Sequence, residues 1–332
     1  MNEIALSAKD FTTDQEVRWC PGCGDYAILK AVRKVLADIG RPPHEVAFVS
    51  GIGCAARFPY YLSTYGFHTI HGRAAAVASG LKLARPELDV WVVGGDGDFL
   101  SIGGNHTIHV LRRNIDLNLL LFNNAIYGLT KGQYSPTSAI GTRSPSSPEG
   151  SADSPINAAS LALGSGARFV ARSADTLQDH LPEILKRAQA HKGASFVEIF
   201  QNCIVYNDNA FGPITDKTAG PDVVVRAEHG EPLIFGKDRE KGLVFDPERN
   251  QFKPVVIGDE ATRDQIAHHD ETSLTLAQAL AVMDGPGAPM VLGVLYCAPE
   301  ATYRERLPEN YRTKPLDRSA LSDLLLGAAA SR

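Results

Sequence analysis

The sequence predicts an α/β protein with a doubly wound, mainly parallel sheet and a C-terminal appendage. Amphipathic stretches with a helical period alternate with short apolar runs, which is the pattern of parallel strands connected by helices. The chain has 332 residues, of which 44% are hydrophobic and 21% charged, so it can bury a substantial core. These observations exclude a disordered or fibrous protein.

Helices are expected where apolar residues recur every three to four positions, and strands where a short apolar run is bounded by polar or glycine-rich sequence. In chain order, this rule predicts helices at residues 25–39, 73–84, 105–113, 156–163 and 175–191. It predicts strands at residues 45–50, 89–93, 117–122, 167–171 and 195–200, which are enough for one sheet.

The remaining segments are less regular. Residues 137–157 are rich in Ser, Pro and Gly, and we expect a loop that acts as a lid or faces a partner. Residues 1–203 are assigned to the main domain. Residues 204–332 lack the apolar density for a core of their own, so we expect them to pack on this domain or on a partner subunit. In this extension, residues 242–250 resemble a hairpin and residues 290–296 an apolar strand.

Composition also excludes several classes of protein. No apolar stretch approaches the ~20 residues of a membrane-spanning helix, so no membrane association is expected. Residues 1–19 lack the basic-then-apolar order of a signal peptide, which favours the cytoplasm. The net charge of -5 contains no long single-sign block, and we expect no nucleic-acid partner. Because disulfides are rare in the cytoplasm, the five cysteines point to a metal or a cluster.

Unusual residues directly follow four of the predicted strands. They are residues 51–54, 95–98, 123–124 and 201–203. The carboxyl ends of parallel strands meet at one edge of a sheet, where ligands bind. We therefore expect Cys54 and Cys203 to lie on the same rim as the turn Gly95-Asp96-Gly97-Asp98.

A Gly-Asp-Gly turn alone is common in proteins that bind no ligand there. Here the next helix and strand lead to Asn123-Asn124, and the pairing resembles the thiamin diphosphate fingerprint. A diphosphate needs a hard cation, and Mg²⁺ prefers oxygen ligands. Asp96, Asn124 and the backbone carbonyl of Ile126 supply three such oxygens, while Gly95 and Gly97 allow close approach of the backbone.

The cysteines leave two interpretations open. Cys20 and Cys23 form a C-x-x-C pair that could be half of a zinc site. A zinc knuckle needs a second close pair, whereas Cys54 and Cys203 are solitary and belong to the predicted rim. Four thiolates around an iron–sulfur cluster would instead create a one-electron acceptor beside the thiamin site. His71, which precedes a predicted helix, is a candidate for contact with a phosphate or the reacting carbonyl.

The combined motifs resemble the β subunits of 2-oxoacid:ferredoxin oxidoreductases, most closely the 2-oxoglutarate type. The matching stretches are residues 19–25, 51–54, 71–74, 94–99 and 123–138. The resemblance implies a thiamin diphosphate site at Gly95, Asp96, Gly97, Asp98, Asn124 and Ile126, with Mg²⁺ held by Asp96, Asn124 and Ile126. It implies a 4Fe-4S cluster held by Cys20, Cys23, Cys54 and Cys203. Cys297 has no part in this scheme and is expected in the core.

The resemblance also implies a reaction and partners. A 2-oxoacid would be oxidatively decarboxylated with coenzyme A (CoA), and electrons would pass through the cluster to ferredoxin, reversibly. For 2-oxoglutarate the products are succinyl-CoA and CO₂. No activating glutamate can be assigned, so we expect this chain to need an α subunit, as an αβ or (αβ)₂ assembly.

Substrate choice and two rival functions remain open. The loop after Tyr127 departs from the pattern of the pyruvate-specific branch, and Lys131 could meet the distal carboxylate of 2-oxoglutarate or be an ordinary surface lysine. Pyruvate or a branched-chain 2-oxoacid is the alternative substrate. A non-redox thiamin decarboxylase would not use the cysteines, and a zinc-stabilised interaction subunit would contain neither iron nor thiamin.

Overall fold

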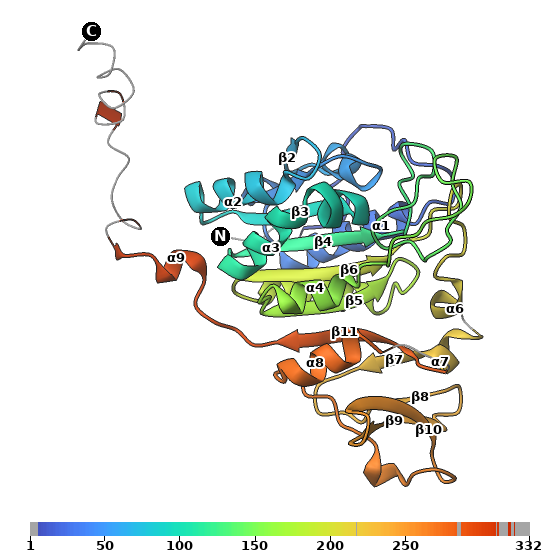
Figure 1. Ribbon diagram of the computed structural model, residues 1–332. Coiled ribbons are helices and arrows are strands. Elements are labelled where there is room, and N and C mark those ends of the chain that lie inside the picture. Colours follow the sequence, from blue (N-terminus) through green and yellow to red (C-terminus); the bar gives the residue numbers. More distant parts are fainter. Residues whose placement is uncertain are drawn as a thin grey trace.

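The computed structural model describes residues 6–216, 218–283, 287–309, 311, 318, 319 and 322. Its main feature is an eight-stranded sheet in the order β2-β1-β3-β4-β6-β5-β11-β7 (Figure 1). The strands are β1 (Val46–Ser50), β2 (Tyr65–His68), β3 (Asp89–Gly95), β4 (Leu117–Asn123), β5 (Phe169–Ala174), β6 (Ala194–Phe200), β7 (Val224–Ala227) and β11 (Met290–Cys297). All neighbouring strands are parallel except β11 and β5, which are antiparallel.

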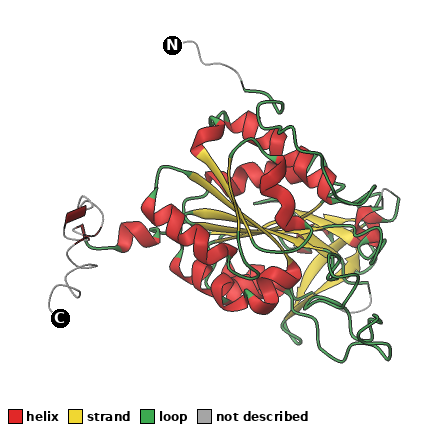
Figure 2. Cartoon of the chain, turned by 90° about the horizontal axis from the view of Figure 1, so that it is seen from above, coloured by secondary structure: helices red, strands yellow, loops and turns green. Residues whose placement is uncertain are grey.

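The strand β4 explains why the sheet is covered on both faces. Leu119 and Leu121 belong to one apolar core, whereas Leu120 and Phe122 belong to the other. Successive side chains of a strand point to opposite faces, so a continuous apolar run supplies both cores. Figure 2 shows the sheet between two layers of helices. The predicted doubly wound α/β fold is confirmed.

The longer helices divide between these two faces. One core contains residues of α2 (Ala74–Ala84), α3 (Gly104–Arg113), α4 (Ala158–Gly164) and α8 (Leu274–Ala281). The other contains residues of α1 (Asp25–Ile39) and α5 (Leu181–Ala190). A short π-helical segment at Asp98–Ile102 precedes α3. Within the described residues no helix is both long and apolar enough to cross a membrane.

The predicted helix at 175–191 begins too early. The structure starts α5 at Leu181, with Pro182 in its first turn. Proline favours the first turn of a helix because its missing N–H has no helical partner there. Asp175, where the predicted helix was to begin, accepts a hydrogen bond from the backbone N–H of Asn202 at 2.9 Å. The turn before α5 therefore packs against the loop that follows β6.

The segment after residue 203 contributes directly to the main sheet. Its strands β7 and β11 extend the sheet beyond β5, and Val225, Leu280 and Leu295 join one of the two cores. A three-stranded antiparallel sheet contains β8 (Ile234–Phe235), β9 (Lys241–Asp246) and β10 (Gln251–Val256). The short helices are α6 (Gly212–Thr215), α7 (Gly220–Val223) and α9 (Tyr303–Arg306). The predicted hairpin and the strand-like run 290–296 are both present, although the hairpin continues to Val256.

The five predicted strands are all present, although β5 begins at Phe169 and ends at Ala174 and does not span 167–171. Besides β11, the sheet contains two strands that the sequence did not predict. The edge strand β2 has four residues, all exposed, so it carries no apolar run to reveal it. The strand β7 is equally short. Parallel pairing with β1 and β11 supplies the hydrogen bonds that make strands of these segments.

Candidate active site

The loops after β1, β3 and β4 line one cavity of about 120 Å³ at the carboxyl edge of the sheet. The lining includes seven of the residues predicted for the thiamin site and its reaction: His71, Gly95, Asp96, Gly97, Asp98, Asn124 and Ile126. It also includes the predicted cluster ligand Cys54. Lys131 lies outside this lining, one residue beyond Thr130, and its side chain is exposed. The rule for open parallel sheets thus placed the cavity correctly.

Asp96 is buried among hydroxyl groups. Its Oδ2 accepts hydrogen bonds from Ser135 Oγ at 2.5 Å and from Thr137 Oγ1 at 2.6 Å. Burial raises the pKa of this carboxyl group to about 6, because the charged form loses its hydration. No cation among the described residues forms an ion pair with Asp96. A divalent cation would supply the missing positive charge.

The sequence interpretation did not assign Ser135 and Thr137 to the site. Both belong to the matching stretch 123–138, and their short, hydroxyl-bearing side chains could have marked them as hydrogen-bond donors to a carboxylate of the site. Thr137 Oγ1 also donates to Asn123 Oδ1 at 2.9 Å. The start of the 137–157 loop is therefore tied to the carboxyl ends of both β3 and β4.

Asp98 holds the candidate residue His71. Its Oδ1 accepts hydrogen bonds from His71 Nδ1 at 2.5 Å and from the backbone N–H groups of Gly72 and Ile52 at 2.8 and 3.2 Å. The other carboxylate oxygen is buried and has no hydrogen-bond partner. A Cβ atom at Gly51 would lie 2.0 Å from that oxygen, so only glycine fits there. Asp98 thus fixes the ring of His71 at the rim, where the histidine side chain is 39% exposed.

Asn124 is fixed by hydrogen bonds from two directions. Its Oδ1 accepts the backbone N–H of Ile126 at 3.2 Å, and its Nδ2 donates to Gln201 Oε1 at 2.8 Å. An amide oxygen has two lone pairs, so Oδ1 can accept one further partner. A carboxylate at Asp96 and an amide oxygen at Asn124 in one cavity form the kind of oxygen donor set that suits Mg²⁺.

All four predicted cluster ligands line a second cavity, of about 210 Å³. Its wall includes Cys20, Cys23, Cys54 and Cys203, all of them free thiols. A Cβ atom at Gly128 would lie 3.4 Å from Cys203 Sγ and 3.8 Å from Cys54 Sγ, so both sulfurs flank this glycine. Within the described residues no three His, Cys, Asp or Glu side chains are grouped tightly enough to hold one metal ion.

Burial opposes deprotonation of two of these thiols, Cys23 and Cys54. Burial raises the pKa of Cys54 to about 12 and raises the pKa of Cys23 further above the ordinary thiol range. Metals bind the thiolate form, so positive charge on the metal must offset this cost. The two arginines that line the cavity, Arg18 and Arg57, add positive charge nearby.

Backbone contacts join the loops that carry the cysteines. The backbone N–H of Gly24 donates to Asn202 O at 3.1 Å, which ties the Cys20–Cys23 turn to the Cys203 loop. Trp19 Nε1 donates to Cys54 O at 2.8 Å. Three segments far apart in sequence thus reach one point without any disulfide.

The two cavities are adjacent. Cys54, Asn124, Gly128 and Leu129 line both of them. A cofactor in the first cavity would therefore be separated from a cluster in the second by a single layer of residues.

Comparison with known proteins identifies the family. Residues 51–199 match the model for the thiamine pyrophosphate enzyme, C-terminal TPP binding domain. The 2-oxoglutarate oxidoreductase subunit KorB of Mycobacterium tuberculosis is 48% identical over 329 residues, covering 96% of this chain and 86% of that protein. The chain belongs to the β subunits of the 2-oxoacid:ferredoxin oxidoreductases.

Two further relatives agree with this membership. Subunit beta of 2-oxoacid:ferredoxin oxidoreductase 1 from Aeropyrum pernix is 39% identical over 300 residues. The match covers 90% of this chain and 84% of the A. pernix subunit. A solved structure of 2-oxoglutarate:ferredoxin oxidoreductase from Magnetococcus marinus, with 2-oxoglutarate, coenzyme A and succinyl-CoA bound, superimposes with a TM-score of 0.75. Identity to that chain is 33%, and the match covers 96% of each chain.

Cys297 of this β subunit lies outside both cavities. It ends β11, is half-buried and packs against the core that contains α1 and α5. Its position agrees with the expected packing role.

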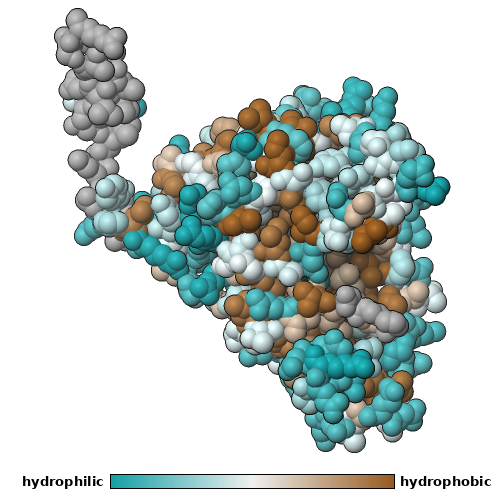
Figure 3. Space-filling view, in the orientation of Figure 1, coloured by the Kyte–Doolittle hydropathy of each residue, from teal (hydrophilic) through white to brown (hydrophobic). Residues whose placement is uncertain are grey.

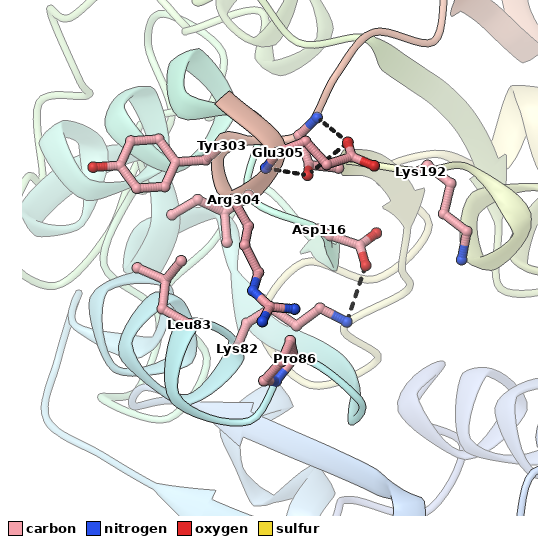
Figure 4. Close-up of a pocket in the computed structure, with 10 residues that line it drawn as sticks. Lys82, Leu83, Pro86, Asp116, Lys192, Tyr303, Arg304 and Glu305 are labelled. Carbon is pink, nitrogen blue, oxygen red and sulfur yellow. Dashed lines mark hydrogen bonds and ion pairs between the residues drawn. The ribbon is translucent and has the colours of Figure 1, made fainter. Parts of the chain in front are cut away.

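A further cavity, of about 380 Å³, lies at the other end of the sheet (Figure 4). It is lined by residues at the end of α2, before β4 and in α9. Lys82 Nζ forms an ion pair with Asp116 Oδ2 at 3.0 Å in its wall. None of the predicted site residues of the β subunit lines this cavity.

Proposed function

We propose that this β subunit, together with an α subunit, catalyses the reversible oxidative decarboxylation of 2-oxoglutarate with CoA to succinyl-CoA and CO₂, and that ferredoxin receives the electrons. The observation that carries the proposal is the shared wall between the cavity at Asp96 and the cavity lined by four cysteines. The substrate follows from the KorB relative, named as a 2-oxoglutarate oxidoreductase subunit, and from the ligands of the M. marinus enzyme.

In this proposal the first cavity binds thiamin diphosphate through Mg²⁺. Asp96, Asn124 and the carbonyl of Ile126 bind the cation, and Gly95 and Gly97 let the backbone approach the diphosphate. When bound, thiamin diphosphate provides an electron sink for the bond that releases CO₂. Asp98 orients His71, which is the side chain of this chain best placed to hold or move a proton at the rim.

The second cavity is proposed to hold a 4Fe-4S cluster. Cys20, Cys23, Cys54 and Cys203 are its ligands, and the adjoining wall provides a short path for single electrons. Cys20 is the exposed member of the set, so the cluster edge nearest to solvent and to ferredoxin lies there. A reducing compartment such as the cytoplasm suits these free thiols.

Lys131 is the proposed contact for the distal carboxylate of 2-oxoglutarate. It lies on the loop that contributes Leu129 and Thr130 to the cofactor cavity. Its φ of 76° is in the left-handed region, so the backbone makes a tight turn at Lys131. Lys131→Met should raise KM for 2-oxoglutarate with little effect on a 2-oxoacid that lacks the second carboxylate. Equal effects on both substrates would refute this contact, and a lower KM for pyruvate or a branched-chain acid than for 2-oxoglutarate in the wild type would favour that acid as the substrate.

The α subunit is proposed to cover the rim. Large apolar side chains that line the cavities are exposed, among them Leu129, Ile204 and Val205, which are 52%, 40% and 54% exposed. Figure 3 shows apolar residues reaching the surface at several places on one face. Burial of such residues is the usual driving force for a stable subunit interface.

The deciding experiment is analysis of iron, sulfide, zinc and thiamin in the αβ complex, purified without oxygen, with a set of Cys→Ser variants. Serine at position 20, 23, 54 or 203 should lower iron content and visible absorption, whereas Cys297→Ser should leave both intact. Thiamin without iron would indicate a non-redox decarboxylase. Zinc without iron, sulfide or thiamin would indicate an interaction subunit. A cluster that survives loss of Cys203 would refute the ligand assignment.

A further inference from the structure

Gln201 occupies the boundary between the two cavities. It is the first residue after β6, and the residue is 1% exposed. Because β6 pairs with β4, with Phe200 opposite Asn123, the backbone N–H of Gln201 donates to Asn123 O at 2.9 Å. This pairing places Gln201 beside Asn124 on one side and the cysteine loops on the other.

The amide of Gln201 bridges the two proposed cofactor sites. Its Oε1 accepts Asn124 Nδ2 at 2.8 Å. Its Nε2 donates to Asn202 O at 2.7 Å and to Cys23 Sγ at 3.2 Å. The carbonyl of Asn202 can only accept, so the amide nitrogen must face it, and this fixes the orientation of the whole amide group.

Each end of the bridge has a chemical consequence. Since Nδ2 of Asn124 is bound to Gln201, the Oδ1 atom of Asn124 is turned the other way and keeps a lone pair for the Mg²⁺ of the cofactor cavity. Hydrogen bonds to cluster sulfurs are one of the factors that set the reduction potential of an iron–sulfur cluster. An N–H donor withdraws electron density from the sulfur, so it stabilises the reduced cluster.

We propose that Gln201 is a positioning residue for both sites: it orients Asn124 toward Mg²⁺ and raises the reduction potential of the cluster through its N–H···Sγ hydrogen bond to Cys23. The inference rests on the proposed function, because it requires both cofactors. One buried side chain thus adjusts the electron donor and the electron acceptor of the same transfer.

Two substitutions separate the two contacts. Gln201→Glu keeps an oxygen for Asn124 but loses the N–H donors, and Gln201→Met keeps the side-chain length but loses both contacts. Gln189→Met is the matched control, because Gln189 is a partly buried amide in α5 whose Nε2 donates to Asp89 Oδ2 at 3.3 Å, away from both cavities.

The variants are studied in the αβ complex purified without oxygen. The cluster potential is read from the electron paramagnetic resonance signal of the reduced cluster during a mediated redox titration. Affinity for thiamin diphosphate with Mg²⁺ is measured by calorimetry on the cofactor-free complex. Both Gln201 variants should have a more negative potential than wild type, and the control should not. Only Gln201→Met should bind the cofactor more weakly, by about fivefold, the value of one neutral hydrogen bond.

An unchanged potential in Gln201→Met with full iron content would overturn the proposal. If that variant does not retain iron, an unchanged potential in Gln201→Glu overturns the proposal instead, since the lost N–H donors and the added negative charge would both lower the potential. Wild-type complex without iron and sulfide would refute the proposed function itself, which is a distinct result.

Discussion

Replacing Arg172 by methionine should destabilise this protein strongly, and adding Glu198→Gln should restore much of the loss. Arg172 of β5 lies opposite Glu198 of β6, and the two side chains are 5% and 3% exposed. Arg172 Nε donates to Glu198 Oε2 at 2.8 Å, and Asn123 Nδ2 donates to Glu198 Oε1 at 2.8 Å. The pair therefore supports Asn123, which in turn binds Thr137 at the cofactor cavity.

The magnitude follows from the cost of an unpaired buried charge. Removing one partner of a buried ion pair costs about 3–5 kcal/mol, whereas neutral residues in place of both partners cost much less. In the double variant, the amide oxygen of glutamine can still accept the hydrogen bond from Asn123. We therefore expect Arg172→Met to lower the free energy of unfolding by about 3–5 kcal/mol, and Arg172→Met/Glu198→Gln to recover about 2 kcal/mol or more of that loss.

The assay is urea unfolding of wild type, both single variants and the double variant under identical cofactor conditions, with the transition midpoints compared. The diagnostic result is the sign of the change in unfolding free energy caused by Glu198→Gln, because this substitution should stabilise the Arg172→Met protein and destabilise wild type. If Glu198→Gln destabilises both backgrounds alike, the two side chains are not coupled and the reasoning fails.

Three further predictions test the site and the core. Asp96→Asn removes the only carboxylate proposed to bind Mg²⁺, so affinity for thiamin diphosphate in calorimetry should fall by about 100-fold or more. Thermal stability without cofactor should be kept, because no cation among the described residues pairs with Asp96. Unchanged affinity would contradict the magnesium site. At Gly97 a Cβ atom would lie 2.1 Å from the Tyr127 ring, so Gly97→Ala should cost about 1–3 kcal/mol in urea unfolding, whereas Gly104→Ala, with nothing within 4 Å, should be neutral or slightly stabilising. Burial lowers the pKa of His191 to about 4, so between about pH 6.5 and pH 4 the unfolded chain binds the proton more readily and stability falls as pH falls. His191→Phe should therefore reduce the loss of stability between pH 7 and pH 5 by about 2 kcal/mol, and an unaltered pH dependence would show that His191 is protonated without cost.

Local sequence patterns were sufficient to predict most helices and strands and the edge of the sheet at which the candidate site lies. The apolar runs of β1, β3, β4, β5 and β6 are buried on both faces of the sheet, so their composition alone identifies them as strands. The edge strand β2 has no buried face, so its sequence carries no such signal. The start of α5 was misjudged because the helical period extends through the turn at 175–180, which is held instead by the contact of Asp175 with the loop after β6.

By itself, the sequence determined the fold class, the edge of the sheet that carries the site, and the residues Asp96, Asn124 and the four cysteines that meet there. The edge, Asp96, Asn124, Cys54 and Cys203 follow from residues close in sequence, together with the rule that carboxyl ends of parallel strands converge, whereas Cys20 and Cys23 were placed with them by the family resemblance. Only the tertiary structure decided which residues bridge them. The strand β6 inserts between β4 and β5, so Gln201 lies beside Asn124 and Cys23, and the 137–157 loop folds back so that Thr137 reaches Asp96. Strand order and loop course depend on packing between distant segments, which no local period encodes.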